Sequence, residues 1–289
     1  MIRGHSKPAP RDPAPVSPQE SASSVHVVVL GSGSSGNCTA LVMGDRIVLV
    51  DCGFSPLQTR KRMALCGLDP TRVAGIVLTH PDSDHLNAGW TRALGGLTGP
   101  MLHVAKRHAH SVRYSGVNAS AIVAHDDEFE VAGLVFAALR MPHDSEGSCA
   151  FRIERGDVRI GYATDLGRTT PELAEHLAGC PILCLESNYC PAMQLASGRP
   201  AFLVDRIMGG RGHLSNHQAL ALAQSIHRTA PIQRLILLHL SRQCNAPEVV
   251  RRLYAERAPE LLDRLVVTGQ IVPSAPVEAT AGGHARALF

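Results

Sequence analysis

The sequence has no apolar run of the ~18 residues that a helix needs to cross a bilayer, and no apolar segment near its start. We therefore expect no membrane span, no targeting signal, no membrane partner and a cytoplasmic protein. No repeat period is visible either, which argues against a repeat array. With 289 residues, of which 45% are hydrophobic, the chain can bury a substantial core.

Paired cysteine motifs are also missing. None of the eight cysteines forms a CxxC pair, and most lie inside apolar runs, at positions 38, 52, 66, 149, 180, 184, 190 and 244. This spacing argues against a zinc ribbon and against a disulfide framework. We expect buried, reduced thiols.

The net charge of +3 is small and does not by itself indicate a nucleic-acid partner. Its distribution is uneven, because residues 199–265 hold ten arginines against five acidic residues. Such an excess attracts a phosphate backbone. Helix faces that carry solvated arginines would explain it equally well.

The composition divides the chain into three parts. Residues 1–24 are rich in proline and serine, and we expect them to form a disordered tail; residues 25–270 should form one domain, and residues 271–289 a C-terminal tail. Early hairpins followed by alternating strands and helices predict an α+β fold with two mixed sheets between helices. Strands are expected at 25–30, 39–43, 46–50, 75–79, 134–140, 149–154, 157–163, 181–186 and 234–238, and helices at 56–66, from 171, at 216–228 and at 246–255.

A dense polar cluster follows the apolar strand that ends near residue 78. It reads His80-Pro81-Asp82-Ser83-Asp84-His85. His80 and Asp82 can project to one side and reach one cation, while Asp84 and His85 can reach a second cation ~3.5–4 Å away. Imidazole and carboxylate groups suit a borderline divalent ion. A polar turn that caps the next helix is the alternative.

Three further candidates each follow an apolar strand: His143, Asp165 and His239. Each alone is weak evidence, since a histidine at a strand end is more often a structural residue. Together with the first cluster they predict a site for two divalent metal ions.

The order of these residues resembles that of the metallo-β-lactamase superfamily. Further segments resemble its YycJ/WalJ-like subgroup, namely Leu30-Gly31-Ser32-Gly33-Ser34-Ser35-Gly36-Asn37, Asp51-Cys52-Gly53, Glu186-Ser187-Asn188, Gly212-His213-Leu214-Ser215-Asn216 and His239-Leu240-Ser241. The resemblance covers roughly residues 25–270. It implies a four-layer αβ/βα sandwich with the site at one edge, and phosphodiesterase or exonuclease activity on DNA.

The resemblance also implies a role for each residue of the site. One metal would be held by His80, Asp82 and His143, the other by Asp84, His85 and His239, and Asp165 would bridge them. A hydroxide between the metals would be the nucleophile, because two cations lower the pKa of bound water. We count Asp84 among the catalytic residues as well as among the ligands.

Asp82 departs from the family pattern, which usually has histidine at this position. With Asp84 and Asp165 it brings three negative charges, which leaves two divalent ions with a net +1 where a histidine would leave +2. This favours Mn²⁺ or Fe²⁺ over Zn²⁺. Alternatively, Asp82 is too short to ligate and only one metal binds tightly. A carboxylate here also resembles the flavodiiron proteins, but 289 residues leave no room for their flavin-binding domain.

His213 is the candidate general acid, with Glu186 as its carboxylate partner, as in related phosphodiesterases. A capping or core role for His213 is the alternative. Ser35 and Asn37 are candidates for substrate binding, on a loop whose backbone N–H groups could form an anion nest, and Asn188 joins them. The loop is not a Walker P-loop, because no Gly-Lys-Ser/Thr follows. We expect His108 and His110 at the surface.

The spacing from Asp165 to His239 leaves no room for a large inserted cap or an arm that grips tRNA. Single-stranded DNA or a small phosphodiester is therefore the favoured partner. The leading hypothesis is a phosphodiesterase or exonuclease with two divalent ions, Zn²⁺ or Mn²⁺, with Fe²⁺ as a further option. One alternative is a hydrolase of a small ester or lactone on the same fold, since a fold supports many chemistries. Another is a non-catalytic metal-binding regulatory module.

Overall fold

The computed structural model describes residues 24–94, 99–280 and 285–287. The tail expected over residues 1–24 lies, apart from Ser24, outside the described residues. Within them, no helix is long and apolar enough to span a membrane. None of the eight cysteines forms a disulfide; Cys66 and Cys190 are half-buried, and the others are buried as expected.

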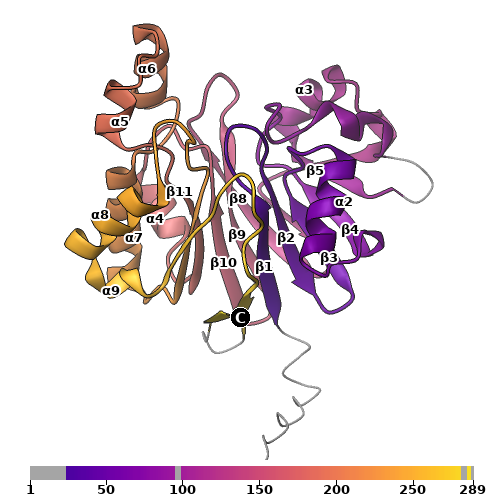
Figure 1. Ribbon diagram of the computed structural model, residues 1–289. Coiled ribbons are helices and arrows are strands. Elements are labelled where there is room, and N and C mark those ends of the chain that lie inside the picture. The colour runs from indigo at the N-terminus through magenta and orange to yellow at the C-terminus, as the bar shows by residue number, and fades with distance from the viewer. Residues whose placement is uncertain (1–23, 95–98, 281–284, 288–289) are drawn as a thin grey trace, which may run out of the picture.

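The described chain forms two mixed sheets that face each other (Figure 1). The first has eight strands, in the order β15 (Ala285–Ala287), β14 (Val277–Ala279), β1 (Val25–Gly31), β2 (Cys38–Met43), β3 (Arg46–Val50), β4 (Val73–Val77), β5 (Met101–Ala105) and β6 (Ile122–His125). The second has seven, in the order β13 (Leu265–Val267), β12 (Arg234–Leu238), β11 (Ile182–Glu186), β10 (Val158–Ala163), β9 (Ser148–Arg155), β8 (Leu134–Met141) and β7 (Glu128–Val131). Pairing is antiparallel over β1–β3 and β7–β10 and parallel over β3–β6 and β10–β13.

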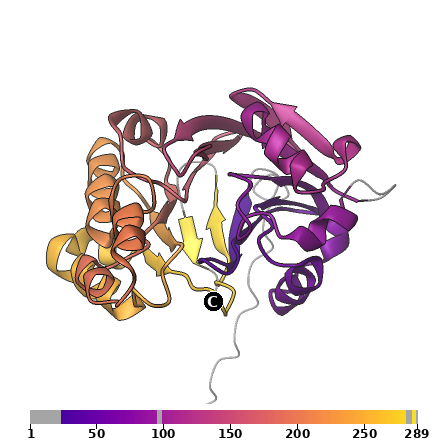
Figure 2. The same cartoon turned by 90° about the horizontal axis from the view of Figure 1, so that it is seen from above.

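Helices cover the outer face of each sheet, as Figure 2 shows from above. The first sheet carries α2 (Pro56–Leu65) and α3 (Ala109–Tyr114). The second carries α4 (Pro171–His176), α7 (Asn216–Thr229), α8 (Pro247–Arg257) and α9 (Pro259–Leu262), while α5 (Pro191–Leu195) and α6 (Ala201–Met208) stand above them (Figure 1). This arrangement confirms the predicted sandwich of two mixed sheets between helices.

The central strands are apolar on both faces because each sheet is covered on both sides. In β1, Val27 and Val29 pack between the two sheets, whereas Val28 and Leu30 pack beneath the helices of the first sheet. Successive side chains of a strand point to opposite faces, so a sheet buried on both faces requires a nearly continuous apolar run. Because such runs are visible in the sequence, these strands could be predicted from it.

The C-terminal boundary expected at residue 270 is wrong. Strand β14 pairs antiparallel with β1, with Val25 opposite Ala279, and the Ser274 amide donates to the Val29 carbonyl at 2.8 Å. An uncovered β1 would leave a row of backbone groups unpaired at the sheet edge. The sheet therefore takes in part of the segment that we expected to be a tail.

Several short elements were missed as well. They are β5, β6, β7, β13, α3, α5, α6 and α9, each of eight residues or fewer. Elements this short carry too few apolar positions for a clear period, and their position is set by pairing and packing with distant parts of the chain.

Candidate metal centre

The predicted ligands converge where strands of both sheets end. His80 lies just beyond β4, His143 beyond β8, Asp165 beyond β10 and His239 beyond β12. Asp165 and His239 have φ values of 54° and 56°. These left-handed conformations are uncommon outside glycine, and they turn the two side chains away from their strands and into the site.

The first group of ligand atoms belongs to His80, His143 and Asp165, whose donors all lie within 4.8 Å of one another. Asp82 extends this group, because its Oδ2 lies 3.6 Å from His80 Nε2 and 3.9 Å from His143 Nε2. His80 Nε2 is buried and has no hydrogen-bond partner among the described residues. A buried polar atom without a partner is costly, and a cation between these donors would satisfy it.

The second group comprises Asp84, His85 and His239, with donors again within 4.8 Å of one another. Asp84 Oδ2 lies 3.2 Å from His239 Nε2. Asp165 adjoins both groups: its Oδ2 lies 3.0 Å from His85 Nε2, and its Oδ1 lies 4.0 Å from His143 Nε2. The structure thus brings all seven predicted ligands together, with Asp165 between the two groups.

The far sides of the imidazole rings are held by fixed partners. His85 Nδ1 lies 2.8 Å from Asp51 Oδ2, His143 Nδ1 lies 2.8 Å from the Gly212 carbonyl oxygen, and His80 Nδ1 lies 3.1 Å from Thr79 Oγ1. An Nδ1–H that donates to an oxygen leaves the Nε2 lone pair free to face the centre, which is the tautomer that a metal ligand needs.

Asp51 was not among the predicted site residues, although the Asp51-Cys52-Gly53 motif was noted. Its carboxylate is fully buried and also accepts hydrogen bonds from the Thr79 backbone N–H and hydroxyl, at 2.8 and 2.9 Å. An acidic residue directly after an apolar strand is the one sequence signal that could have singled it out. It orients His85 and does not face the centre.

The carboxylates of the centre are strongly acidic. Burial opposes the charge of Asp84, but a hydrogen bond with His239 and the nearby charge of His85 lower the pKa of Asp84 to about 2. Burial likewise opposes the charge of Asp165, and His239 and His85 outweigh it, so that the pKa of Asp165 is well below its usual range. Both carboxylates are therefore ionised at neutral pH, as metal ligands must be.

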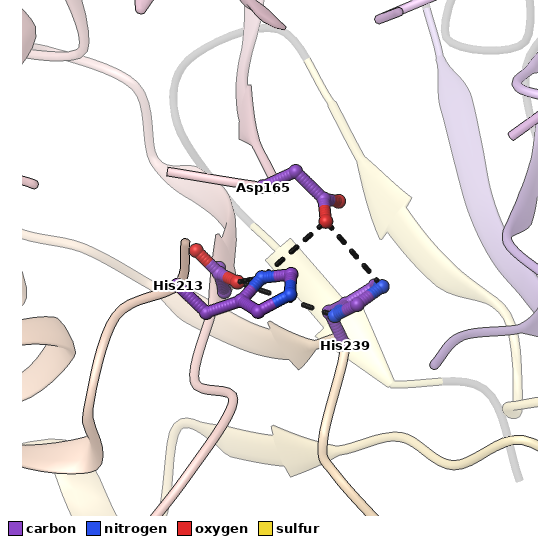
Figure 3. Close-up of side chains that lie close together, drawn as sticks. Asp165, His213 and His239 are labelled. Carbon is purple, nitrogen blue, oxygen red and sulfur yellow. Dashed lines mark hydrogen bonds and ion pairs between the residues drawn. The ribbon is translucent and has the colours of Figure 1, made fainter. Parts of the chain in front are cut away.

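His213 and Glu186 form the predicted pair, with Nδ1 of His213 2.6 Å from Oε1 of Glu186. His213 Nδ1 also lies 3.4 Å from Asp165 Oδ1, and Figure 3 shows His213 and His239 side by side next to Asp165. Burial opposes the charge of His213, but the Glu186 carboxylate outweighs it and raises the pKa of His213 to about 9.

His213 does not cap the helix that follows it. Ser215 is the N-cap of α7 and forms a capping box with Gln218. Glu186 is fully buried, and its Oε2 accepts from the backbone N–H groups of Leu166 and Leu214 at 2.7 and 3.2 Å. Its Oε1 is left for His213, so the carboxylate is a fixed support for the imidazole.

The residues predicted to bind substrate lie differently from expectation. Asn188 is buried, and its Nδ2 donates to the His239 carbonyl oxygen at 2.8 Å. Asn37 is buried too, and its Oδ1 accepts from the Gly33 N–H at 2.8 Å while its Nδ2 lies 3.0 Å from His85 Nε2. Both amides support site histidines and the glycine-serine loop, so we correct their role from substrate binding to positioning.

On the glycine-serine loop, backbone N–H groups expected to form an anion nest already have partners within the protein. The Ser35 N–H donates to Gln270 Oε1 at 2.9 Å, and the Gly36 N–H donates to the Gly33 carbonyl oxygen at 3.0 Å. Donors already used within the protein cannot cradle a phosphate. Ser35 itself is exposed, and its neighbour Ser34 lines the pocket over the metal centre.

The expectation that His108 lies at the surface is wrong, because its side chain is fully buried. Its Nε2 lies 3.0 Å from the Gly147 carbonyl oxygen, on the loop that follows His143. Burial lowers the pKa of His108 to about 4, so it is neutral. His110 is exposed, as expected.

A pocket of about 340 Å³ opens over the centre. It is lined by site residues and by residues around α6, namely Ser34, Asp82, Asp84, His143, Asp144, Asp165, Arg199, Leu203, Arg206, Ile207, Gly212, His213 and His239. A molecule entering this pocket therefore meets residues of both ligand groups, His213 and two arginines.

Comparison with known proteins places this site in a family. The chain matches the beta-lactamase superfamily domain over residues 46–240. It is 25% identical over 234 residues to the exodeoxyribonuclease YycJ of Bacillus anthracis, covering 78% of this chain and 86% of that protein. It is also 25% identical over 230 residues to the exodeoxyribonuclease WalJ of Streptococcus pneumoniae, covering 76% of this chain and 83% of WalJ.

A solved structure agrees with the fold. The metallo-β-lactamase fold protein YhfI of Bacillus subtilis superposes with a TM-score of 0.66 and 17% sequence identity, over 87% of this chain and 99% of YhfI. The family match spans most of the two sheets and every predicted metal ligand. The chain therefore belongs to the beta-lactamase superfamily and has the metallo-β-lactamase fold.

Proposed function

We propose that this protein is a phosphodiesterase with two divalent metal ions that degrades DNA as an exonuclease. The observation that carries the proposal is the pair of ligand groups joined by Asp165, with His213, which Glu186 holds from behind, in the pocket over them. The similarity to two proteins named exodeoxyribonucleases supports DNA as the substrate class.

In this proposal His80, Asp82 and His143 would hold one ion and Asp84, His85 and His239 the other, and Asp165, which adjoins both groups, would serve both. The mixed imidazole and carboxylate donors suit Zn²⁺ or Mn²⁺, with Fe²⁺ also possible. When bound, two such ions neutralise the phosphodiester charge and lower the pKa of a water molecule toward neutrality, which supplies a nucleophile.

The chain's own residues contribute the proton transfer. Protonated His213 lies at the pocket wall with 20% of its side chain exposed, so it can donate a proton to the leaving alkoxide. Glu186 fixes the imidazole through Nδ1, which leaves Nε2 as the donor to substrate. Solvent can then reprotonate the half-buried ring.

The test compares substrate classes and topologies. With Mn²⁺ or Zn²⁺ we expect hydrolysis of 5′-labelled linear single-stranded DNA and of bis(p-nitrophenyl) phosphate, and loss of both activities in excess EDTA. An exonuclease leaves a circular single strand of the same sequence intact, because it needs an end. Cleavage of a lactone or carboxylic ester in place of both phosphodiesters would support the small-ester alternative and contradict the proposal.

Asp82 is expected to decide the metal preference. Its side chain is 47% exposed, and the nearby His80 imidazole, 3.6 Å away, lowers the pKa of Asp82, so it is an available anionic ligand. Replacing it with histidine removes one negative charge and adds a borderline nitrogen donor, which should shift the ratio of bound Zn²⁺ to Mn²⁺ toward zinc by about tenfold. Metal content after equilibration with both ions measures this ratio.

Asp82→Ala serves as the second variant. If Asp82 ligates, the alanine variant should retain one ion per chain less tightly than the wild type, while the other ion is unaffected. Unchanged affinities for both ions would show that Asp82 is not a ligand.

A further inference from the structure

The wall of the pocket opposite the metal ligands comes from the segment that contains α5 and α6. Arg199, Leu203 and Arg206 of this segment line the same pocket as Asp84 and His213. Figure 1 shows both helices standing above the remaining helices of the C-terminal half. Of the ten arginines between residues 199 and 265, two therefore line this pocket.

Arg199 is the cation of this wall that has no counter-charge. Its Nε and Nη2 donate to Gln243 Oε1 at 3.1 and 3.0 Å, and its Nη1 donates to Gln194 Oε1 at 3.4 Å. Both acceptors are neutral amides, and in the described part of the chain no carboxylate forms an ion pair with Arg199. Arg206 differs, since it is paired with Asp144, and its Nε lies 3.0 Å from Asp144 Oδ1.

The orientation of Arg199 is set by a buried support. Gln194 is fully buried. The hydroxyl of Ser197 donates to the Gln194 carbonyl oxygen at 2.7 Å and so stabilises the turn between Gln194 and Arg199. Gln243, on another loop, donates to the Ser197 carbonyl oxygen at 3.4 Å. When a guanidinium is held by neutral groups, no neighbouring carboxylate offsets its positive charge. Because these groups already hold the side chain in place, it loses little conformational entropy when it binds a phosphate.

The pocket continues beyond the centre along α6. A second hollow of about 730 Å³ shares Asp144 and Arg206 with the first and is also lined by Phe202, Asp205 and Arg211, so its two arginines are accompanied by two carboxylates. Phe202 is 73% exposed, so its ring is accessible from this hollow. An exposed aromatic ring next to arginines is the combination on which single-stranded nucleic acids stack their bases.

We propose that Arg199 binds the phosphate next to the scissile one, so that the substrate is a single-stranded chain that lies along α6 and carries at least two phosphates. The inference rests on the proposed phosphodiesterase function and specifies its substrate. Arg206 pairs with Asp144 and holds α6 against the loop that carries His143, while Arg199 receives the substrate.

Binding tests the inference without turnover. The probe is a fluorescein-labelled oligothymidylate with phosphorothioate linkages that resist cleavage, and its anisotropy is measured with the metal-loaded protein. Arg199→Gln should raise Kd about tenfold, as expected for loss of a charge-assisted contact. It should also reduce the slope of log Kd against log salt by about one, because one phosphate contact is lost.

The matched control is Arg251→Gln, which makes the same charge change at an exposed position of α8. It should leave Kd and the salt slope at their wild-type values. Equal effects of the two variants, or an unchanged salt slope in Arg199→Gln, would overturn the inference. Arg199→Lys should keep the slope while losing part of the affinity, which a purely structural role would not predict.

Kinetics separate this inference from the proposed function. Arg199→Gln should lower kcat/KM about tenfold more for an oligonucleotide than for bis(p-nitrophenyl) phosphate, which has one phosphate. Equal losses on both substrates would refute the role of Arg199 and leave the phosphodiesterase standing. If the wild type hydrolysed neither substrate, the proposed function would fall, and the binding difference between the two glutamine variants would still decide the Arg199 site.

Discussion

Replacing His85 with alanine is expected to lower phosphodiester hydrolysis by about 10³-fold or more. His85 Nε2 faces the centre, 3.0 Å from Asp165 Oδ2, and is fully buried. Without this imidazole, an ion in the second group would be left with only Asp84, His239 and Asp165 as ligands. The nucleophile that depends on both ions would then be lost.

Metal content and folding must be measured with the activity. We expect the His85→Ala protein to lose about one ion per chain by elemental analysis, with a wild-type far-ultraviolet circular dichroism spectrum. His110→Ala is the matched control, because His110 is exposed and lies outside the site. Full activity in a folded His85→Ala protein would exclude the assignment of His85, and His85→Gln repeats the test with a side chain of closer size.

Replacing His213 with glutamine should lower kcat on DNA by about 10²–10⁴-fold, the range expected when a general acid is lost. The structural reason is the fixed pair: Glu186 holds His213 at 2.6 Å and raises its pKa to about 9, so the ring carries its proton at neutral pH. Bound cations would lower this pKa toward neutrality, where a proton donor is most effective. The metal content should stay at the wild-type level.

The leaving group distinguishes an acid from a ligand. An alkoxide needs a proton to depart, whereas p-nitrophenolate departs as a stable anion, so the defect of His213→Gln should be much smaller on bis(p-nitrophenyl) phosphate. His213 also lies in a cluster with Asp165, Glu186 and His239 that could hold a metal. Loss of an ion together with equal defects on both substrates would identify His213 as a ligand and refute the general-acid role.

The predicted ligands could be found from the sequence because each is determined locally. His80 to His85 lie within six residues, and His143, Asp165 and His239 each follow an apolar strand. An apolar run that ends in a histidine or aspartate places that side chain at the edge of a sheet. Strand ends of a mixed sandwich meet at such an edge, so the local pattern already implied convergence.

The supporting residues could not be assigned in this way. Asn37 and Asn188 stand in recognisable motifs, but only the packing shows that their amides contact His85 and His239 rather than a substrate. The sequence does not distinguish a short polar side chain that faces a pocket from one that contacts a metal-ligating histidine. The burial of His108 was equally invisible, because it depends on contact with the loop at Gly147.

By itself the sequence predicted the two-sheet architecture and the candidate ligands of the centre, since apolar periods and strand-end residues are properties of short segments. The resemblance of its motifs indicated the family. Tertiary structure alone decided that β14 pairs with β1, that Asp51 orients His85, and that Arg199 contacts glutamines and no carboxylate of the described residues. These features depend on which distant segments meet. The sequence shows that a residue is an arginine and carries a charge, but only the folded chain determines whether a carboxylate lies close enough to pair with it.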